Sequence, residues 1–122
     1  VGKVRIGRDT NVQALACIHM TTAISDAVIG SEVTIGHAAV IHGAIVGDGA
    51  LVGMGALLLD NARIGEEAFV GAGALVTSGT VIPPRTLALG RPAKVVRELT
   101  EAEAAQGRKS AKKYLWLADD HR

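Results

Sequence analysis

Three of the four histidines, His19, His37 and His42, lie within a stretch of 24 residues. Three neutral imidazoles with an open fourth position form the ligand set of a catalytic zinc site. A zinc ion held in this way lowers the pKa of water to about 7 and supplies a nucleophile at neutral pH. Each histidine alone would be interpreted as a surface or corner residue, whereas the cluster predicts a metal site. The fourth, His121, is interpreted as solvent-facing or as a contact with a helix C-terminus.

A six-residue repeat must position these histidines. Each repeat reads aliphatic, often Gly, two variable residues, a small residue and a variable one. The aliphatic positions are Ile6, Val12, Ile18, Ile29, Ile35, Ile41, Val46, Val52, Leu58, Ile64, Val70, Val76 and Ile82. A period of six fits neither a helix nor simple strand alternation. It predicts an all-β fold, a parallel β-helix of four to five coils, in which the small residue lets the chain bend at a corner.

The coil geometry predicts how the histidines are related. His19 and His37 are eighteen residues, or three repeats, apart, so we expect them one layer apart, at about 4.8 Å. His19 and His42 each follow an axial aliphatic residue directly, whereas His37 follows one by two residues and should point the other way. All metal-binding nitrogens must lie about 2.1 Å from the ion. We therefore expect His37 to complete a site formed by His19 and His42 of a neighbouring chain, in a ring of three protomers.

Two irregularities interrupt the repeat, and both flank histidines. Ile18 and Ile29 are eleven residues apart, and Ile41 and Val46 are five apart. Changes in residue number at corners re-aim side chains locally, as bulges do in ordinary sheets.

The repeat is predicted to end at residues 82–85, where two prolines cannot donate to a strand ladder, and residues 90–94 are expected to lead away from the coil. Thr100 and Glu103 form a capping-box pattern. It predicts a C-terminal α-helix from about Glu101 to Asp119. This divides the chain into a β-helix domain with its extension (1–99) and a helix (100–122). The helix has an apolar stripe, formed by Ala111, Tyr114, Leu115 and Ala118. Its basic face, which we expect to be solvated, is formed by Arg108, Lys109, Lys112 and Lys113.

Composition limits the class of function. The 122 residues carry a net charge of +1 and are 48% hydrophobic, with one Phe, one Tyr and one Trp. The balanced charge predicts no nucleic-acid or membrane partner, and the lone Cys17 excludes an intrachain disulfide. No apolar run suggests a membrane span or signal segment, so we expect a cytoplasmic protein. The chain starts at Val1, and an N-terminal piece is expected to be missing.

Several motifs resemble the γ-class carbonic anhydrases, over Arg5 to Leu99. The motifs are Thr10-Asn11-Val12-Gln13, Ile18-His19, the run Ile35 to Gly43 with its two histidines, Val52 to Ala56, Val70 to Val76, and Gly90-Arg91-Pro92-Ala93-Lys94. The resemblance implies a left-handed coil, a homotrimer, and zinc (alternatively iron or cobalt) held by His19, His37 and His42. It also implies an enzyme, a lyase that reversibly hydrates carbon dioxide to bicarbonate. Asn11 and Gln13 match pocket-lining positions that orient the hydroxide or substrate, although a corner Asn also suits left-handed backbone.

The chain departs from this family in its acidic groups. Ala14 stands where the family often has Asp, and the family's Arg-Gly-Asp segment would precede Val1. No glutamate replaces the proton-shuttling acid loop. Metal binding is therefore a firmer prediction than rapid turnover.

Two alternatives stay open. A hexapeptide acyltransferase would use one histidine as general base, with the acyl carrier in the coil groove, and it shares the Gly-x-Pro-Ala-Lys ending. A non-catalytic trimeric metal-binding scaffold would agree with the missing acidic groups. Stabilisation by zinc but not by coenzyme A would separate the metal-binding interpretations from acyl transfer.

Overall fold

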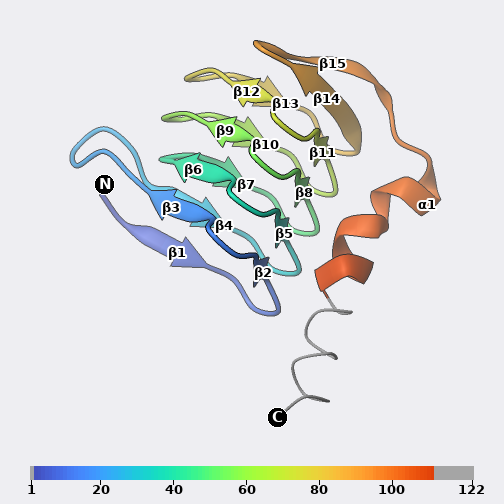
Figure 1. Cartoon of the computed structure of the whole chain (residues 1–122), viewed down its shortest axis with the longest axis horizontal. Coiled ribbons are helices and arrows are strands. Elements are labelled where there is room, and N and C mark those ends of the chain that lie inside the picture. Colours follow the sequence, from blue (N-terminus) through green and yellow to red (C-terminus); the bar gives the residue numbers. More distant parts are fainter. Residues whose placement is uncertain (1, 112–122) are drawn as a thin grey trace.

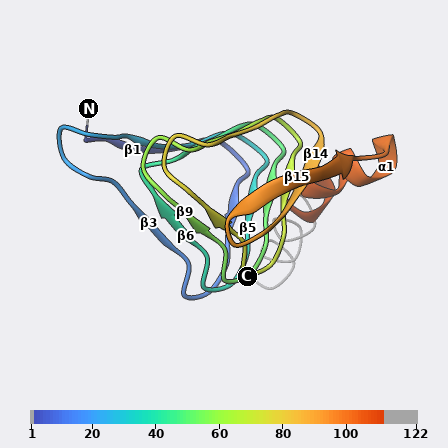
Figure 2. The same cartoon turned by 90° about the horizontal axis from the view of Figure 1, so that it is seen from above.

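The computed structural model describes residues 2–111, which wind into a triangular prism with one predominantly parallel sheet on each side (Figures 1 and 2). The first sheet contains β1 (Val4–Ile6), β4 (Ala27–Ile29), β7 (Ile45–Val46), β10 (Arg63–Ile64) and β13 (Val81–Ile82). The second contains β2 (Asn11–Val12), β5 (Thr34–Ile35), β8 (Leu51–Val52), β11 (Phe69–Val70), β14 (Thr86–Gly90) and β15 (Ala93–Glu98). The third contains β3 (Cys17–His19), β6 (Val40–His42), β9 (Leu57–Leu58) and β12 (Leu75–Val76). The predicted parallel β-helix is confirmed.

The aliphatic residue of each repeat points to the prism axis. Ile35, Ile41 and Leu58 are fully buried there, one from the second sheet and two from the third. In the middle coils the small residues of the repeat are also buried, as at Ala39 and Ala56. They fill the inner side of each corner, so their small size serves packing. The narrow interior explains why the chain needs so few aromatic residues.

The chain bends one residue earlier than predicted, at the third position after the aliphatic. This position has a left-handed backbone at Glu32, Ala38, Gly49 and Asn61, with φ between 56 and 70°. Most of these corners hold non-glycine residues, and each such residue costs about 1 kcal/mol or more. The coil tolerates this cost because the hydrogen bonds to the adjacent coils hold the corner in place, such as Ala38 N–H to the Ala14 carbonyl at 3.1 Å.

The last coil does not lead away from the prism as predicted. Residues 90–93 form a tight hairpin, and β15 returns antiparallel along β14. Antiparallel pairing covers the edge that β14 would otherwise expose. The hairpin therefore closes one end of the second sheet.

The C-terminal helix begins as predicted. Thr100 caps α1 (Glu101–Ala104) with a complete capping box, and helical turns continue over 106–111. The predicted continuation to Asp119 lies outside the described residues. No helix within residues 2–111 is long and apolar enough to cross a membrane.

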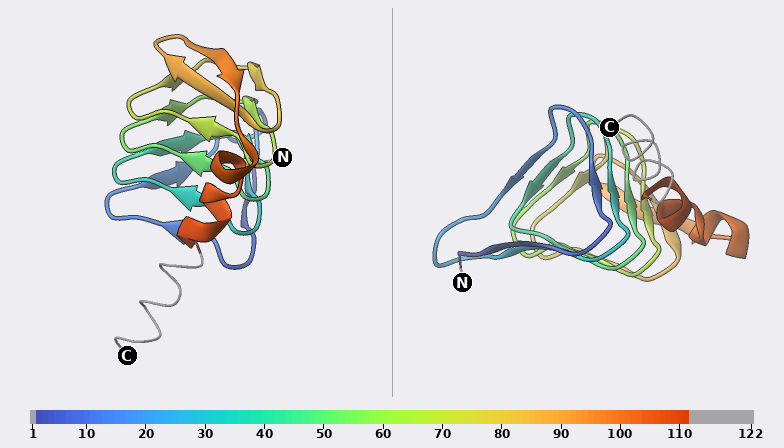
Figure 3. Two further views of the ribbon diagram at one scale, coloured as in Figure 1. Left: turned by 90° about the vertical axis from the view of Figure 1, so that its right-hand side faces the viewer. Right: turned by 90° about the horizontal axis from the view of Figure 1, so that it is seen from below.

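The prediction of a solvated basic face is wrong for Arg108, which forms ion pairs with the coil. The helix runs along the corner between the first and second sheets (Figure 3), and Arg108 lies over Gly49, the one corner of this stack without a side chain. A β-carbon at Gly49 would lie 2.7 Å from Arg108 Nε. The guanidinium bridges the coils on either side, with Nη1 3.0 Å from Glu32 Oε1 and Nε 3.3 Å from Glu67 Oε2. This interaction fixes the helix to the coil.

Two glycines of one corner should differ in their tolerance of a methyl group. A β-carbon at Gly53 would lie 2.5 Å from the backbone nitrogen of Ala72 in the next coil, whereas one at Gly55 meets nothing within 4 Å. We expect Gly53→Ala to lower the free energy of unfolding by about 3 kcal/mol. Gly55→Ala should cost about 1 kcal/mol, because only its left-handed backbone opposes it. Urea unfolding of both variants measures the two decreases in the free energy of unfolding. Equal decreases would contradict this prediction.

The helix cap should weaken in acid. The pKa of Glu103 is lowered to about 2 by its hydrogen bonds with Arg97 and with the Thr100 backbone. A carboxylate with a lowered pKa stabilises the fold above its ordinary value, near 4.5, and this contribution is lost as the pH falls through about 2. We expect the amide protection of residues 101–104, measured relative to the exchange rate of an unstructured peptide at the same pH, to fall as the pH is lowered between these two values. In Glu103→Gln, which has no carboxylate to protonate, the protection of these amides should not change over the same pH interval.

Candidate functional site

His19 and His42 stand side by side on the third sheet. They end β3 and β6 and are direct register partners, and their ring centroids lie 5.1 Å apart at an interplanar angle of 43°. The expectation that His19 would neighbour His37 is therefore wrong. His19 pairs instead with a histidine 23 residues further along the chain.

A loop between β3 and β4 causes this change of partner. Residues 20–26 leave the triangle before the chain enters the first sheet, and Figure 2 shows the loop extending beyond the prism. The eleven-residue gap in the repeat is this loop. It lengthens one turn of the coil and shifts the register, which brings His42 rather than His37 over His19.

The loop also supplies polar partners for His42. Thr21 Oγ1 lies 2.9 Å from His42 Nε2 and 3.0 Å from Asp60 Oδ2. Ser25 Oγ donates to Asp60 Oδ1 at 2.6 Å and accepts from the Thr21 backbone N–H at 3.1 Å. His42 Nε2 lies 3.7 Å from Asp60 Oδ1. His42 is thus linked through a hydroxyl to a carboxylate of the next coil.

The environment of Asp60 favours its ionised form. The hydrogen bond from Ser25 lowers the pKa of Asp60 against the effect of desolvation, and the hydrogen bond from Thr21 and the nearby His42 and His19 lower it further. Gly43 makes room for this arrangement, because a β-carbon there would collide with Ser25 Oγ and Asp60 Oδ1. The Asp60 carboxylate is therefore fixed in position and favoured in its ionised form.

Thr21, Ser25 and Asp60 were not predicted as site residues. Asp60 lies eighteen residues, or three repeats, after His42, so the period alone could have placed it one coil further along. Thr21 and Ser25 belong to the loop, where the repeat carries no information.

His37 lies at a different corner from the histidine pair. It is exposed, in the turn between β5 and β6, and the strand β6 separates it from His42. A chain corner and the strand β6 (Val40–His42) therefore lie between the two histidines, whereas the ligands of one ion must each lie about 2.1 Å from it. Among residues 2–111 no three metal-binding side chains come together. Each chain brings together only two of the three predicted ligands.

Asn11 and Gln13 lie on the side of His37. Asn11 is in β2, and its Oδ1 is buried without a hydrogen-bond partner among residues 2–111. Gln13 lines a cavity of about 310 Å³ with Gly36, which precedes His37, and with Met54 and Ser110. The structure thus divides the predicted site into two parts: Asn11 and Gln13 along the second sheet with His37 in the turn that follows it, and His19 and His42 on the third sheet.

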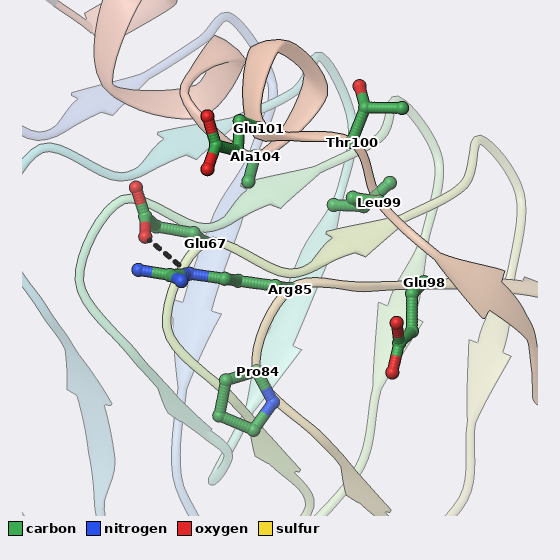
Figure 4. Close-up of a pocket in the computed structure, with 8 residues that line it drawn as sticks. All are labelled: Glu67, Pro84, Arg85, Glu98, Leu99, Thr100, Glu101 and Ala104. Carbon is green, nitrogen blue, oxygen red and sulfur yellow. Dashed lines mark hydrogen bonds and ion pairs between the residues drawn. The ribbon is translucent and has the colours of Figure 1, made fainter.

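A larger cavity, of about 470 Å³, lies elsewhere on the molecule. It opens between the last coil and the segment that leads into α1 (Figure 4), and is lined by Glu67, Pro84, Arg85, Glu98, Leu99, Thr100, Glu101 and Ala104. Arg85 Nε bonds Glu67 Oε1 at 3.1 Å across it. None of the three candidate histidines is among these lining residues, so it is not the predicted site.

Comparison with known proteins defines the class of protein. The family model for the bacterial transferase hexapeptide, in six repeats, matches residues 43–78. A hexapeptide transferase family protein from Anaplasma phagocytophilum is 38% identical with a TM-score of 0.89, and the match covers 96% of this chain and 68% of that one. The chain belongs to the hexapeptide transferase family, and its coil is the left-handed β-helix that the resemblance implied. None of the curated proteins compared with it matches significantly.

Two further structures carry names that describe an activity. A Bacillus cereus protein called a "putative acetyltransferase" is 32% identical, with a TM-score of 0.83 and coverage of 97% of this chain and 80% of that one. Soybean serine acetyltransferase complexed with serine is 34% identical, with a TM-score of 0.63 and coverage of 76% and 40%. These names agree with the acyltransferase alternative better than with the carbonic anhydrase resemblance.

Proposed function

We propose that the chain forms a homotrimer that binds zinc (alternatively iron or cobalt) at its interfaces and reversibly hydrates carbon dioxide to bicarbonate. The observation that carries this proposal is the pairing of His19 with His42, whose rings lie 5.1 Å apart. Two imidazoles in register on neighbouring strands can both turn a nitrogen toward one ion. Asp60 and Thr21 restrain His42, as partners outside the ligand shell commonly do in metal sites.

The third ligand is proposed to come from a neighbouring protomer. His37 is exposed and lies at the other end of β6 from His42. A ring of three prisms would bring the corner of one chain to the histidine pair of the next, which gives one site per interface. Gln13 and Asn11 would arrive with His37, because they lie on that side of the chain.

The residues of the chain then have separate roles. The bound ion would supply Lewis-acid activation of water near neutral pH. His19, His42 and His37 would hold it, and the Gln13 amide would orient the attacking oxygen or the substrate. The orphaned Oδ1 of Asn11 is available to accept a hydrogen bond at that side. Ala14 follows Gln13 without a carboxylate, which predicts slow proton removal.

Acyl transfer is the second candidate, and two observations favour it. The relatives named above include acetyltransferases, and His42 is linked to Asp60 through Thr21. A histidine oriented by a carboxylate can act as general base toward a hydroxyl or amine acceptor. This candidate uses His42 alone and has no role for His37. It therefore differs from the first candidate in what coenzyme A and zinc should do.

Mixing two inactive variants tests the shared site. His37→Ala and His42→Ala should each fail to bind zinc. When they are unfolded and refolded together in equal amounts, about one quarter of the interfaces in a random trimer should combine an intact histidine pair with an intact His37. Zinc content should rise accordingly, in contrast to either variant refolded alone. A mixture that binds no zinc, in a trimer shown to exchange subunits, contradicts the shared site.

Activity and ligand binding separate the candidate reactions. We expect zinc, and not coenzyme A, to raise the melting temperature of the metal-free protein, and stopped-flow carbon dioxide hydration to rise with pH through about 7. His42→Ala should abolish this rate, and Ala14→Asp should raise it or leave it unchanged. Stabilisation by coenzyme A alone would favour acyl transfer. Zinc binding without hydration in any variant would favour a non-catalytic scaffold.

A further inference from the structure

The hydroxyl of Thr21 lies between a carboxylate oxygen and an imidazole nitrogen and has one hydrogen to give. Its oxygen is 3.0 Å from Asp60 Oδ2 and 2.9 Å from His42 Nε2. An ionised carboxylate only accepts hydrogen bonds, and a hydroxyl can donate one and accept others. The arrangement is satisfied only if one of the two neighbours of Thr21 is itself a donor.

The charge on Asp60 decides the direction of the chain of hydrogen bonds. Ser25 already donates to Asp60 Oδ1, and a hydrogen bond to a carboxylate is roughly twice as strong as a neutral one. If Thr21 donated to His42 instead, its lone pairs would face Asp60 Oδ2 at 3.0 Å without a hydrogen between them. Thr21 therefore donates to Asp60, and His42 Nε2 carries the hydrogen that Thr21 accepts.

We propose that Thr21 and Asp60 are positioning residues that hold His42 in the Nε2–H tautomer, which leaves Nδ1 as the nitrogen with the free lone pair. A neutral imidazole has one donor nitrogen and one acceptor nitrogen, so fixing the first assigns the second. Ser25 and Gly43 complete the device, because Ser25 anchors Asp60 and Gly43 makes room for both side chains. The use of Nδ1 toward a metal rests on the proposed function, whereas the tautomer does not.

The loop of residues 20–26 positions Thr21 beside His42. It holds Thr21 over the end of β6 through the Thr21 N–H to Ser25 Oγ bond, 3.1 Å long. The insertion that brings His42 over His19 is thus also the segment that orients the His42 ring. His19 has no such partner among the hydrogen bonds of the described residues, so the two histidines of the pair should differ in their tautomer behaviour.

Nitrogen-15 NMR of the metal-free protein tests the tautomer directly. At about pH 8 the neutral His42 ring should give one Nε2–H signal. Its proton should exchange with water slowly enough to be observed. Thr21→Ser keeps the hydroxyl and should keep this signal. Thr21→Val removes the hydroxyl at nearly constant volume and should lose the protected proton, and circular dichroism confirms that both variants remain folded.

The outcomes are distinct. An Nδ1–H signal for His42 in the wild-type protein overturns the proposal without any variant, and so does a protected Nε2–H that survives in Thr21→Val. Zinc titration adds a second readout: we expect Thr21→Val to bind about 10- to 100-fold more weakly, and Thr21→Ser to stay within a few-fold of wild type. Equal affinity in wild type and Thr21→Val overturns the role of the network toward the metal. A wild-type protein that binds no zinc refutes the proposed function. The NMR experiment then still shows whether Thr21 and Asp60 hold His42 in the Nε2–H tautomer.

Discussion

Parallel hydrogen bonding between successive coils is the constraint on which the rest of the structure depends. Each coil places a strand on each sheet, and each strand lies in register with the one below. Gly53 approaches the backbone of Ala72 so closely that no side chain fits. Because the coils cannot slide or separate, residues far apart in sequence, such as His19 and His42, are held at one fixed separation.

The longest interruption of this regular stacking is also where the polar cluster around His42 forms. The loop of residues 20–26 changes the register by which His19 meets the next coil, and it brings Thr21 and Ser25 to Asp60. A regular prism would have stacked the histidines differently and left Asp60 without these partners. At the opposite side, Arg108 fixes the C-terminal helix to Glu32 and Glu67. The histidine cluster and the contact that fixes the helix thus occupy separate corners.

Membership of the hexapeptide transferase family does not by itself choose a reaction, because the coil is a scaffold that holds different sites. Two features of this chain bear on the choice. The His19–His42 pair favours metal binding, while the linkage of His42 to a carboxylate would also suit a general base. The two proposals place different groups beside the histidine pair. Metal binding needs His37 of a neighbouring protomer there, whereas acyl transfer needs an acyl carrier.

The sequence by itself determined the architecture, because a period of six in aliphatic residues can bury its side chains only in a stacked triangular coil. It also determined the capping box at Thr100 and the set of candidate histidines. Tertiary structure alone decided which histidines meet, since the loop after His19 has no period and its length says nothing of its path. The same holds for Arg108, whose partners lie 76 and 41 residues away, and for the hairpin of β14 and β15. These contacts depend on register between distant segments, and local patterns do not encode it.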